Sequence, residues 1–250
     1  MEPFSSLAVG YATGKLTELV ESTIRANVIE RWGRHRARQF FEAFCEAVTD
    51  EKTSEADLQQ RLDDLLSDDR RSEVLFDAYR SVCLTRSKTL GPRVIALLTA
   101  ELVMGESVAD DGESAIFGAA EELSDSELIE FSEFAMQHHM RAKENTKDSC
   151  SLTDAGGVRI QWGEETFDSN WHREIEVSLA PLDLANDFGT WAPKLKRHGL
   201  LSDDVKERQW DYKEDGERHI DEDGTARQVS WWLCLSSSAI RFAELIQKAR

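Results

Sequence analysis

The chain has 250 residues, of which 30 are Lys or Arg and 48 are Asp or Glu, so its formal net charge at pH 7 is −18. This length allows one large domain or two modest ones with a proper hydrophobic core, and an apolar content of 40% excludes an intrinsically disordered chain. A surface this negative repels phosphate, which argues against non-specific DNA binding and against binding to anionic membranes.

The sequence contains no segment of the roughly 18 to 20 consecutive apolar residues that span a bilayer. The most apolar run, residues 94–104, is too short and contains Glu101. The first residues, Met1 to Phe4, lack the basic and apolar regions of a signal peptide. The four cysteines include no C-x-x-C pair, so we expect reduced structural thiols. We therefore expect a soluble, cytoplasmic protein without a membrane partner.

The first third of the sequence predicts helices. Residues 5–48 carry an apolar stripe with spacings of three and four, and Gly33 is expected to kink or divide this helix. Ser54 and Asp57 resemble a capping box that opens a leucine-bearing helix. Asp68 or Asp69 caps the next helix, whose apolar positions are Val74, Leu75, Tyr79 and Val82.

A second group of helices is predicted beyond Gly91 and Pro92, which break the chain. Pro92 suits the first turn of a helix over 93–104 that is apolar on nearly every side, so we expect this helix at the centre of the bundle. Ser124 and Glu127 form a cleaner capping box, which opens a helix over 128–143. Residues 106–112 are expected to be an exposed acidic loop.

The composition changes after Lys143. Residues 146–157 are polar and end in two glycines, which is typical of a linker. Six of the seven tryptophans follow, which suggests a separate small core. The predicted domains are an all-helical region over 1–145, a linker over 146–157 and a second domain over 158–250.

The predicted elements of the second domain have a recognisable order. Alternating apolar residues predict a strand over 174–180, helices follow over 182–188 and 190–198, and Gly199 suits a left-handed exit. Two strands, 208–213 and 228–235, are joined by a charged loop, and a helix over 238–250 ends the chain. The run from Leu184 to Gly189, followed by Leu195 to Leu201, resembles the helix-turn-helix and exit of winged-helix proteins. The expected fold class is mainly α, with an N-terminal helical bundle followed by a small α+β winged-helix-like domain.

The helix order of the N-terminal region is similar to that of uncharacterised bacterial helical proteins, some of them from mobile-element or phage-defence neighbourhoods. This resemblance implies an accessory subunit of a multi-protein system such as phage defence. We therefore expect a non-enzymatic interaction or regulatory protein whose partner is another protein, either a different subunit or the chain itself.

Two basic clusters are the candidate contact sites. The first cluster contains Arg31, Arg34, Arg36 and Arg38. These side chains either bind a phosphate or an acidic partner, or form a solvated or internally paired helix face. The second contains Thr190, Lys194, Lys196, Arg197 and His198, which lie where the resemblance places a recognition helix for the DNA major groove. The loop that would form the wing is acidic, so a protein partner is favoured over DNA. A DNA-binding transcription regulator that uses the helix over 190–198 is the alternative.

Catalytic signals are weak. Asp211, Tyr212 and Lys213 match the end of a nuclease metal site without its upstream carboxylate, so a metal-dependent nuclease is the third hypothesis. Adjacent helical residues point about 100° apart, so His138 and His139 are expected to be a solvent-side pair rather than metal ligands. We predict no cofactor, no metal site and no catalytic residue.

The last candidate is Trp232, in the predicted strand over 228–235. Side chains alternate between the two faces of a strand. Val229, Trp231, Leu233 and Leu235 would then face the core, and Trp232 would face the other side. We expect Trp232 to be the most exposed large aromatic residue of the second domain and part of a contact surface.

Overall fold

In the computed structural model, the chain forms two compact units, Met1–Ser107 and Val108–Arg250. The structure describes residues 30–48, 69–104, 109–144, 149–169, 181–211 and 225–250. The described part is mostly helical and also contains one small antiparallel sheet, as the sequence predicted. None of the described helices is both long and apolar enough to cross a membrane.

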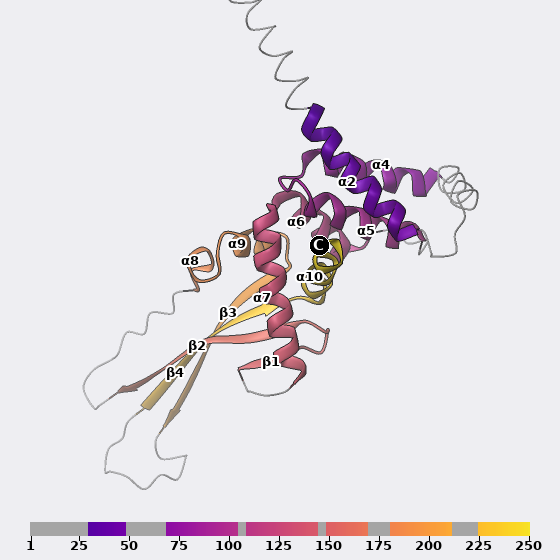
Figure 1. The fold of residues 1–250 in the computed structure, drawn as a ribbon. Helices are drawn as coiled ribbons and strands as arrows, with labels where there is room; N and C mark the ends of the chain where they lie inside the picture. The colour runs from indigo at the N-terminus through magenta and orange to yellow at the C-terminus, as the bar shows by residue number, and fades with distance from the viewer. Residues whose placement is uncertain (1–29, 49–68, 105–108, 145–148, 170–180, 212–224) are drawn as a thin grey trace, which may run out of the picture. The chain divides into compact units, whose positions relative to one another are not determined.

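Unit 1 (Met1–Ser107) contains helices α2 (Glu30–Val48), α4 (Asp69–Leu84) and α5 (Leu90–Met104) (Figure 1). Helix α5 packs against both of the others, and nearly all of its apolar side chains are buried. This confirms its predicted central position, and Pro92 lies in its first turn. Helix α2 is continuous through Gly33, so the described part of the predicted helix is not divided there. The predicted capping box at Ser54 and Asp57 lies outside the described residues.

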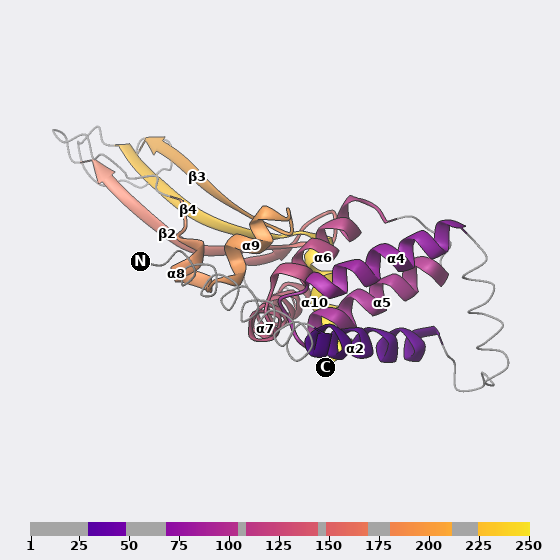
Figure 2. The ribbon, with the colours of Figure 1, turned by 90° about the horizontal axis from the view of Figure 1, so that it is seen from above.

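Unit 2 (Val108–Arg250) combines helices with the sheet. Its elements in chain order are α6 (Asp111–Glu122), α7 (Asp125–Lys143), β1 (Cys150–Leu152), β2 (Val158–Ser169), α8 (Leu184–Phe188), α9 (Trp191–Arg197), β3 (Leu201–Asp211), β4 (Thr225–Leu235) and α10 (Ser237–Ala249). The sheet order is β1-β2-β4-β3, with every neighbouring pair antiparallel. Figure 2 shows β2, β3 and β4 running together as a curved ribbon away from the helices of this unit.

The core of unit 2 lies between α7, α9, α10 and one face of the sheet. The ring of Phe131 on α7 lies 5.5 Å from both Trp191 on α9 and Phe242 on α10. Val229, Leu233 and Leu235 are buried, as predicted for this face of β4, whereas Trp231 is only half-buried. Helices α6 and α7 therefore belong with the sheet, although the sequence analysis placed residues up to 145 in the helical region.

The expected linker over 146–157 includes a short strand. β1 pairs with β2, and the tight connection between them has Gly156 at φ 84° and Gly157 against β4. A side chain at Gly157 would place its Cβ 2.3 Å from the carbonyl oxygen of Leu235, so only glycine is accommodated there. These contacts join the predicted linker closely to the sheet.

Several elements of unit 2 were expected and others were missed. Ser124 and Glu127 form the predicted capping box, and Gly199 has the expected positive φ of 72°. β3 and β4 are longer than the predicted strands, while β2 and α6 were not expected. The expected loop over 106–112 ends in a second capping box, in which Asp110 caps α6. The predicted strand over 174–180 lies outside the described residues.

Candidate functional site

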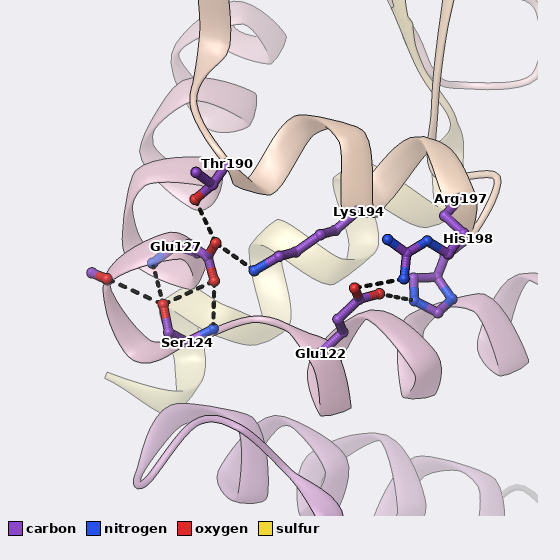
Figure 3. A network of polar contacts seen from close by, with 8 residues as sticks. Glu122, Ser124, Glu127, Thr190, Lys194, Arg197 and His198 are labelled. Atoms are coloured by element: carbon purple, nitrogen blue, oxygen red, sulfur yellow. Dashed lines mark hydrogen bonds and ion pairs between the residues drawn. The ribbon is translucent and has the colours of Figure 1, made fainter. Parts of the chain in front are cut away.

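Helix α9, the expected contact helix, is held against the corner between α6 and α7 by its apolar side chains. Trp191, Ala192 and Leu195 are buried, and Trp191 is only 2% exposed. Its ring contacts Phe131 and Phe134 of α7 at centroid distances of 5.5 and 5.3 Å. The polar side chains of α9 are thereby brought to the start of α7 and the end of α6 (Figure 3).

Glu127 is the centre of the polar contacts. Its carboxylate accepts hydrogen bonds from the backbone N–H and the hydroxyl of Ser124 at 2.8 and 2.9 Å. The Nζ of Lys194 lies 2.5 Å from Oε1 of the same carboxylate, and the hydroxyl of Thr190 donates to it at 2.5 Å. The capping acid of α7 thus also binds two side chains of the α9 segment, which are more than sixty residues distant in the sequence. Thr190 stands at the N-cap of α9, but its side chain makes no capping hydrogen bond there.

The charge of Glu127 is stabilised in spite of burial. The side chains of Lys194 and Glu127 are only 13% and 9% exposed. Burial acts to raise the pKa of the carboxyl, but the hydrogen bonds from Lys194, Ser124 and Thr190 outweigh it and lower the pKa to about 2. Glu127 therefore stays ionised throughout the physiological range and balances the charge of Lys194.

Glu122, at the end of α6, binds the other end of α9. Its carboxylate accepts from Nη1 of Arg197 at 2.7 Å and lies 3.0 Å from Nε2 of His198. Gly118, one turn earlier in α6, leaves room for the imidazole: a Cβ there would lie 2.6 Å from Nδ1 of His198. Figure 3 shows Arg197 and His198 converging on Glu122 from the same end of α9.

Lys196 pairs in a different direction, with Asp203 of β3. Every basic side chain of the expected contact helix thus contacts a carboxylate inside unit 2: Lys194 contacts Glu127, Lys196 contacts Asp203, and Arg197 and His198 contact Glu122. We call these seven residues the α9 ion-pair cluster. The side chains of Lys196 and Arg197 are 50% and 67% exposed to solvent, whereas that of Lys194 is largely buried.

The basic cluster of α2 also makes contacts inside its unit. Nε of Arg36 donates to the carbonyl of Ser87 at 3.2 Å, and its Nη1 donates to the carbonyl of Cys83 at 3.5 Å, which ties α2 to the end of α4. Arg38 pairs with Glu42 one turn away at 2.7 Å. Arg34 is exposed and also has an interaction partner, and the side chain of Arg31 lies outside the described part.

Trp232 is half-buried, so the expectation that it is the most exposed aromatic residue of this region is wrong. Arg159 covers its ring at 4.1 Å from the centroid, and its Nε1 donates to the hydroxyl of Ser230 at 2.9 Å. The predicted face of Trp232 is right, because it lies opposite the buried face of β4. The difference arises because Arg159, from the neighbouring strand β2, stacks on the indole.

Trp162 is the more exposed aromatic residue, with 44% of its surface accessible. It lies at a β-bulge, because the pairing of β2 with β4 shifts register between Gln161 and Gly163. The Trp162 ring lies 4.4 Å from Phe188 at the end of α8. Phe188 in turn contacts Phe134 of α7 at 5.7 Å, and Phe134 contacts His138 at 4.5 Å.

These four residues, Trp162, Phe188, Phe134 and His138, are partly exposed and form what we call the aromatic surface of unit 2. Its rings continue inward to Trp191 and Phe131, so the surface is rigidly supported by the core. Two carboxylates are close to these rings in the sequence: Glu130 lies one turn before Phe134 in α7, and Asp187 directly precedes Phe188 in α8. Within the described part of the chain neither carboxylate forms an ion pair.

The two adjacent histidines of α7 do not form the solvent-side pair that the sequence predicted. His139 is buried with 8% exposure, His138 is half-buried, and Nδ1 of each lacks a hydrogen-bond partner. Burial lowers the pKa of both imidazoles, with further lowering by Arg141 at His138 and by Lys143 at His139. Nowhere in the described ranges do His, Cys, Asp and Glu side chains gather in threes in a way that could hold a metal ion.

The nuclease candidate is only partly covered by the structure. Asp211 ends β3, while Tyr212 and Lys213 lie outside the described residues. Its role therefore stays a prediction.

The acidic partners of α9 and the aromatic surface were not predicted from the sequence. Glu127 was visible as a capping residue, but its second set of partners lies too far along the chain to be identified from local pattern. Trp162 follows Val158 and Ile160 at alternate positions, which is a strand signal that could have been recognised. The bulge that aims Trp162 at α8 leaves no such signal.

The chain was also compared with known proteins. No protein-family model, no curated protein and no solved structure matches this chain.

Proposed function

We propose that the protein is a non-enzymatic interaction subunit that binds another protein through unit 2. The observation that carries this proposal is the α9 ion-pair cluster. A helix that reads DNA needs cations that are free to contact phosphate and base edges. Lys194 is instead enclosed against Glu127, and the other cations of α9 are each matched by a carboxylate at contact distance.

We also propose a winged-helix arrangement for unit 2. Helix α7, strand β2, helices α8 and α9 and strands β3 and β4 follow one another in the order of that fold, with β4 between β2 and β3. In this interpretation α9 is the equivalent of a recognition helix. Its cationic side chains serve the packing against α6, α7 and β3, which is consistent with a winged helix used for protein contact.

The proposed docking surface is the aromatic surface. Aromatic rings supported by a rigid core are favoured as anchors at protein interfaces. Glu130 and Asp187 add negative charge beside these rings, and the whole chain carries a net charge of −18. The complementary partner is a segment with apolar and basic side chains, because aromatic faces and carboxylates both attract Arg and Lys.

The test compares two tryptophan variants in affinity capture from native extract. Trp162→Ser removes the exposed anchor, whereas Trp232→Ser removes an indole from the same sheet that is covered by Arg159. A protein that wild type and Trp232→Ser capture equally and Trp162→Ser loses by about tenfold or more supports the proposal. Its capture should weaken as salt increases, because the contact includes charge.

Capture that depends on Trp232 and not on Trp162 would contradict the proposed surface. The same result would place the contact site on the opposite face of the sheet, around Trp232, as the sequence analysis predicted.

A DNA-binding regulator is the second candidate, and the strand order of unit 2 is the observation that favours it. An electrophoretic shift assay with genomic fragments separates the two candidates. Sequence-selective binding at physiological salt that is lost when Lys194, Lys196 and Arg197 become Glu would establish the regulator. A metal-dependent nuclease and a role in phage defence stay predictions, and plasmid cleavage with added divalent metal tests the former.

A further inference from the structure

Helix α4 in unit 1 has apolar side chains on two opposite faces. Ala78 and Val82 are buried, with 3% and 0% exposure, on the face toward the other helices of the unit. On the outward side, Phe76 and Leu84 are 66% and 67% exposed, and Tyr79 is 39% exposed. Tyr79, one of the apolar positions named for this helix from the sequence, lies on this outward side.

The outward apolar side chains continue onto α2. Phe41 is 46% exposed and its ring lies 5.8 Å from that of Tyr79. We call Phe41, Phe76, Tyr79, Cys83 and Leu84 the α4 outer face. Large exposed apolar residues that are contiguous, rather than scattered singly, mark a surface that is covered in the functioning protein.

Two charged side chains lie on the same outward side of α4 and identify what covers it. Asp77 and Arg80 are exposed, and neither is paired with a described residue of this chain. They carry opposite charges and lie close to the middle of the helix. When a second copy of this helix is placed opposite the first by a two-fold rotation, Asp77 of each copy comes close to Arg80 of the other. The α4 outer face is therefore complementary to a second copy of itself.

We propose that the α4 outer face binds a second copy of this chain, with the two α4 helices antiparallel about a two-fold axis between Tyr79 and Arg80. With a rise of about 1.5 Å per residue, this axis places Phe76 opposite the partner's Cys83 and Tyr79 opposite the partner's Arg80. Asp77 is then about 3 Å along the helix axis from the partner's Arg80, within reach of an ion pair. The same contacts occur twice, as an isologous dimer requires.

Sedimentation equilibrium of the full chain tests the proposal. Wild type should form a species of twice the 28.4 kDa chain mass, in a concentration-dependent equilibrium. Phe76→Glu should raise the dimer dissociation constant by at least about 30-fold, because it buries a carboxylate in the apolar contact. Met104→Glu is the matched control, since Met104 is also an exposed apolar residue of unit 1, at 51%, and should leave dimerisation unchanged.

A charge exchange tests the antiparallel arrangement. Asp77→Arg alone brings like charges together across the two-fold axis and should weaken the dimer. Asp77→Arg combined with Arg80→Asp restores opposite charges and should recover most of the wild-type affinity. An affinity that falls further in the double variant would overturn the arrangement.

Alkylation of Cys83 provides a second readout that does not depend on a variant. Cys83 is exposed in the single chain, so iodoacetamide should modify it readily at low protein concentration and slowly in the dimer. A chain that remains monomeric at all concentrations would overturn the proposal. So would a dimer that forms equally well with Phe76→Glu, or a monomer in which Cys83 is already protected by another part of the chain.

Discussion

His138 and His139 are neighbours in α7 with distinct surroundings in unit 2. The imidazole of His138 lies 4.5 Å from the Phe134 ring in a tilted arrangement, while that of His139 is buried near the charges of Lys143 and Glu244. Nδ1 of both histidines has no hydrogen-bond partner, so neither ring gains a hydrogen bond at this nitrogen that would favour its protonated form. The lowered pKa of each imidazole follows mainly from burial.

We predict that the chain loses stability as the pH falls from about 7 to about 5. The unfolded chain binds protons at these histidines near the ordinary pKa of 6.5, whereas the folded chain binds them only at lower pH. The stabilising contribution is therefore complete above pH 6.5 and is lost as the pH falls through the folded pKa. Urea unfolding across this range, comparing wild type with His138→Leu/His139→Leu, measures the effect.

The double variant should show a smaller slope of unfolding free energy against pH. An identical slope in the two proteins would mean that these histidines titrate alike in the folded and unfolded states.

At the scale of elements, the contact between α6 and α9 depends on a glycine. Gly118 allows the His198 ring to lie directly on α6 and to reach Glu122. In an open helix, replacing Gly by Ala stabilises by roughly 0.5 to 1 kcal/mol because it restricts the unfolded chain. At Gly118 the added methyl group would collide with the imidazole ring.

We predict that Gly118→Ala destabilises unit 2 by about 1 to 2 kcal/mol, because the displaced ring separates His198 from Glu122. Gly33→Ala in α2 is the control, since nothing lies within 4 Å of the added Cβ, and it should stabilise the protein slightly. Thermal unfolding of both variants measures the difference. Equal stabilisation by both changes would show that α9 is not packed on α6 as described.

Elements with strong local signals could be predicted from the sequence. The capping box at Ser124, the central helix α5 and the left-handed Gly199 all depend on neighbouring residues, and all three occur. Strand β2 was missed because its outer half carries polar residues and a bulge interrupts its alternation at Gly163. Helix α6 was missed although Asp110 and Glu113 form a capping box, because the acidic composition of that segment suggested a loop.

The candidate site was predictable only in part. The basic residues of α9 were identified from the sequence, and the structure supplies their partners Glu122, Glu127 and Asp203. The pairs with Glu127 and Glu122 depend on tertiary packing across more than sixty residues, for which a single sequence carries no signal. The exposure of Trp232 could not be predicted for the same reason, because the covering Arg159 comes from a strand that was not expected.

At the scale of the whole molecule, the boundary between the folded units decides which fragments are stable. The sequence predicts a division over 146–157, and the contacts of the structure divide the chain after Ser107. Helix α7 contributes Phe131 to the core that contains Trp191 and Phe242. Removing α7 would expose both of these aromatic rings.

We predict that a fragment of residues 108–250 folds cooperatively, whereas a fragment of residues 158–250 does not. The shorter fragment lacks both acidic partners of α9 on α6 and α7 as well as Phe131. Near-ultraviolet circular dichroism and thermal unfolding of the two fragments distinguish the two divisions. Cooperative unfolding of 158–250 would instead support the boundary predicted from the sequence.

We infer that the cations of α9 stabilise the fold of unit 2, and a double-mutant cycle on Lys194 and Glu127 measures this contribution. Lys194→Met and Glu127→Gln should each cost about 3 kcal/mol of unfolding free energy, because each leaves the other group enclosed without its partner. The double variant should cost less than the sum, with a coupling of about 2 kcal/mol. The exposed pair of Arg38 and Glu42 is the control and should show little coupling. A coupling near zero for Lys194 and Glu127, together with DNA binding that Lys194→Met abolishes, would show that Lys194 contacts DNA and does not stabilise unit 2.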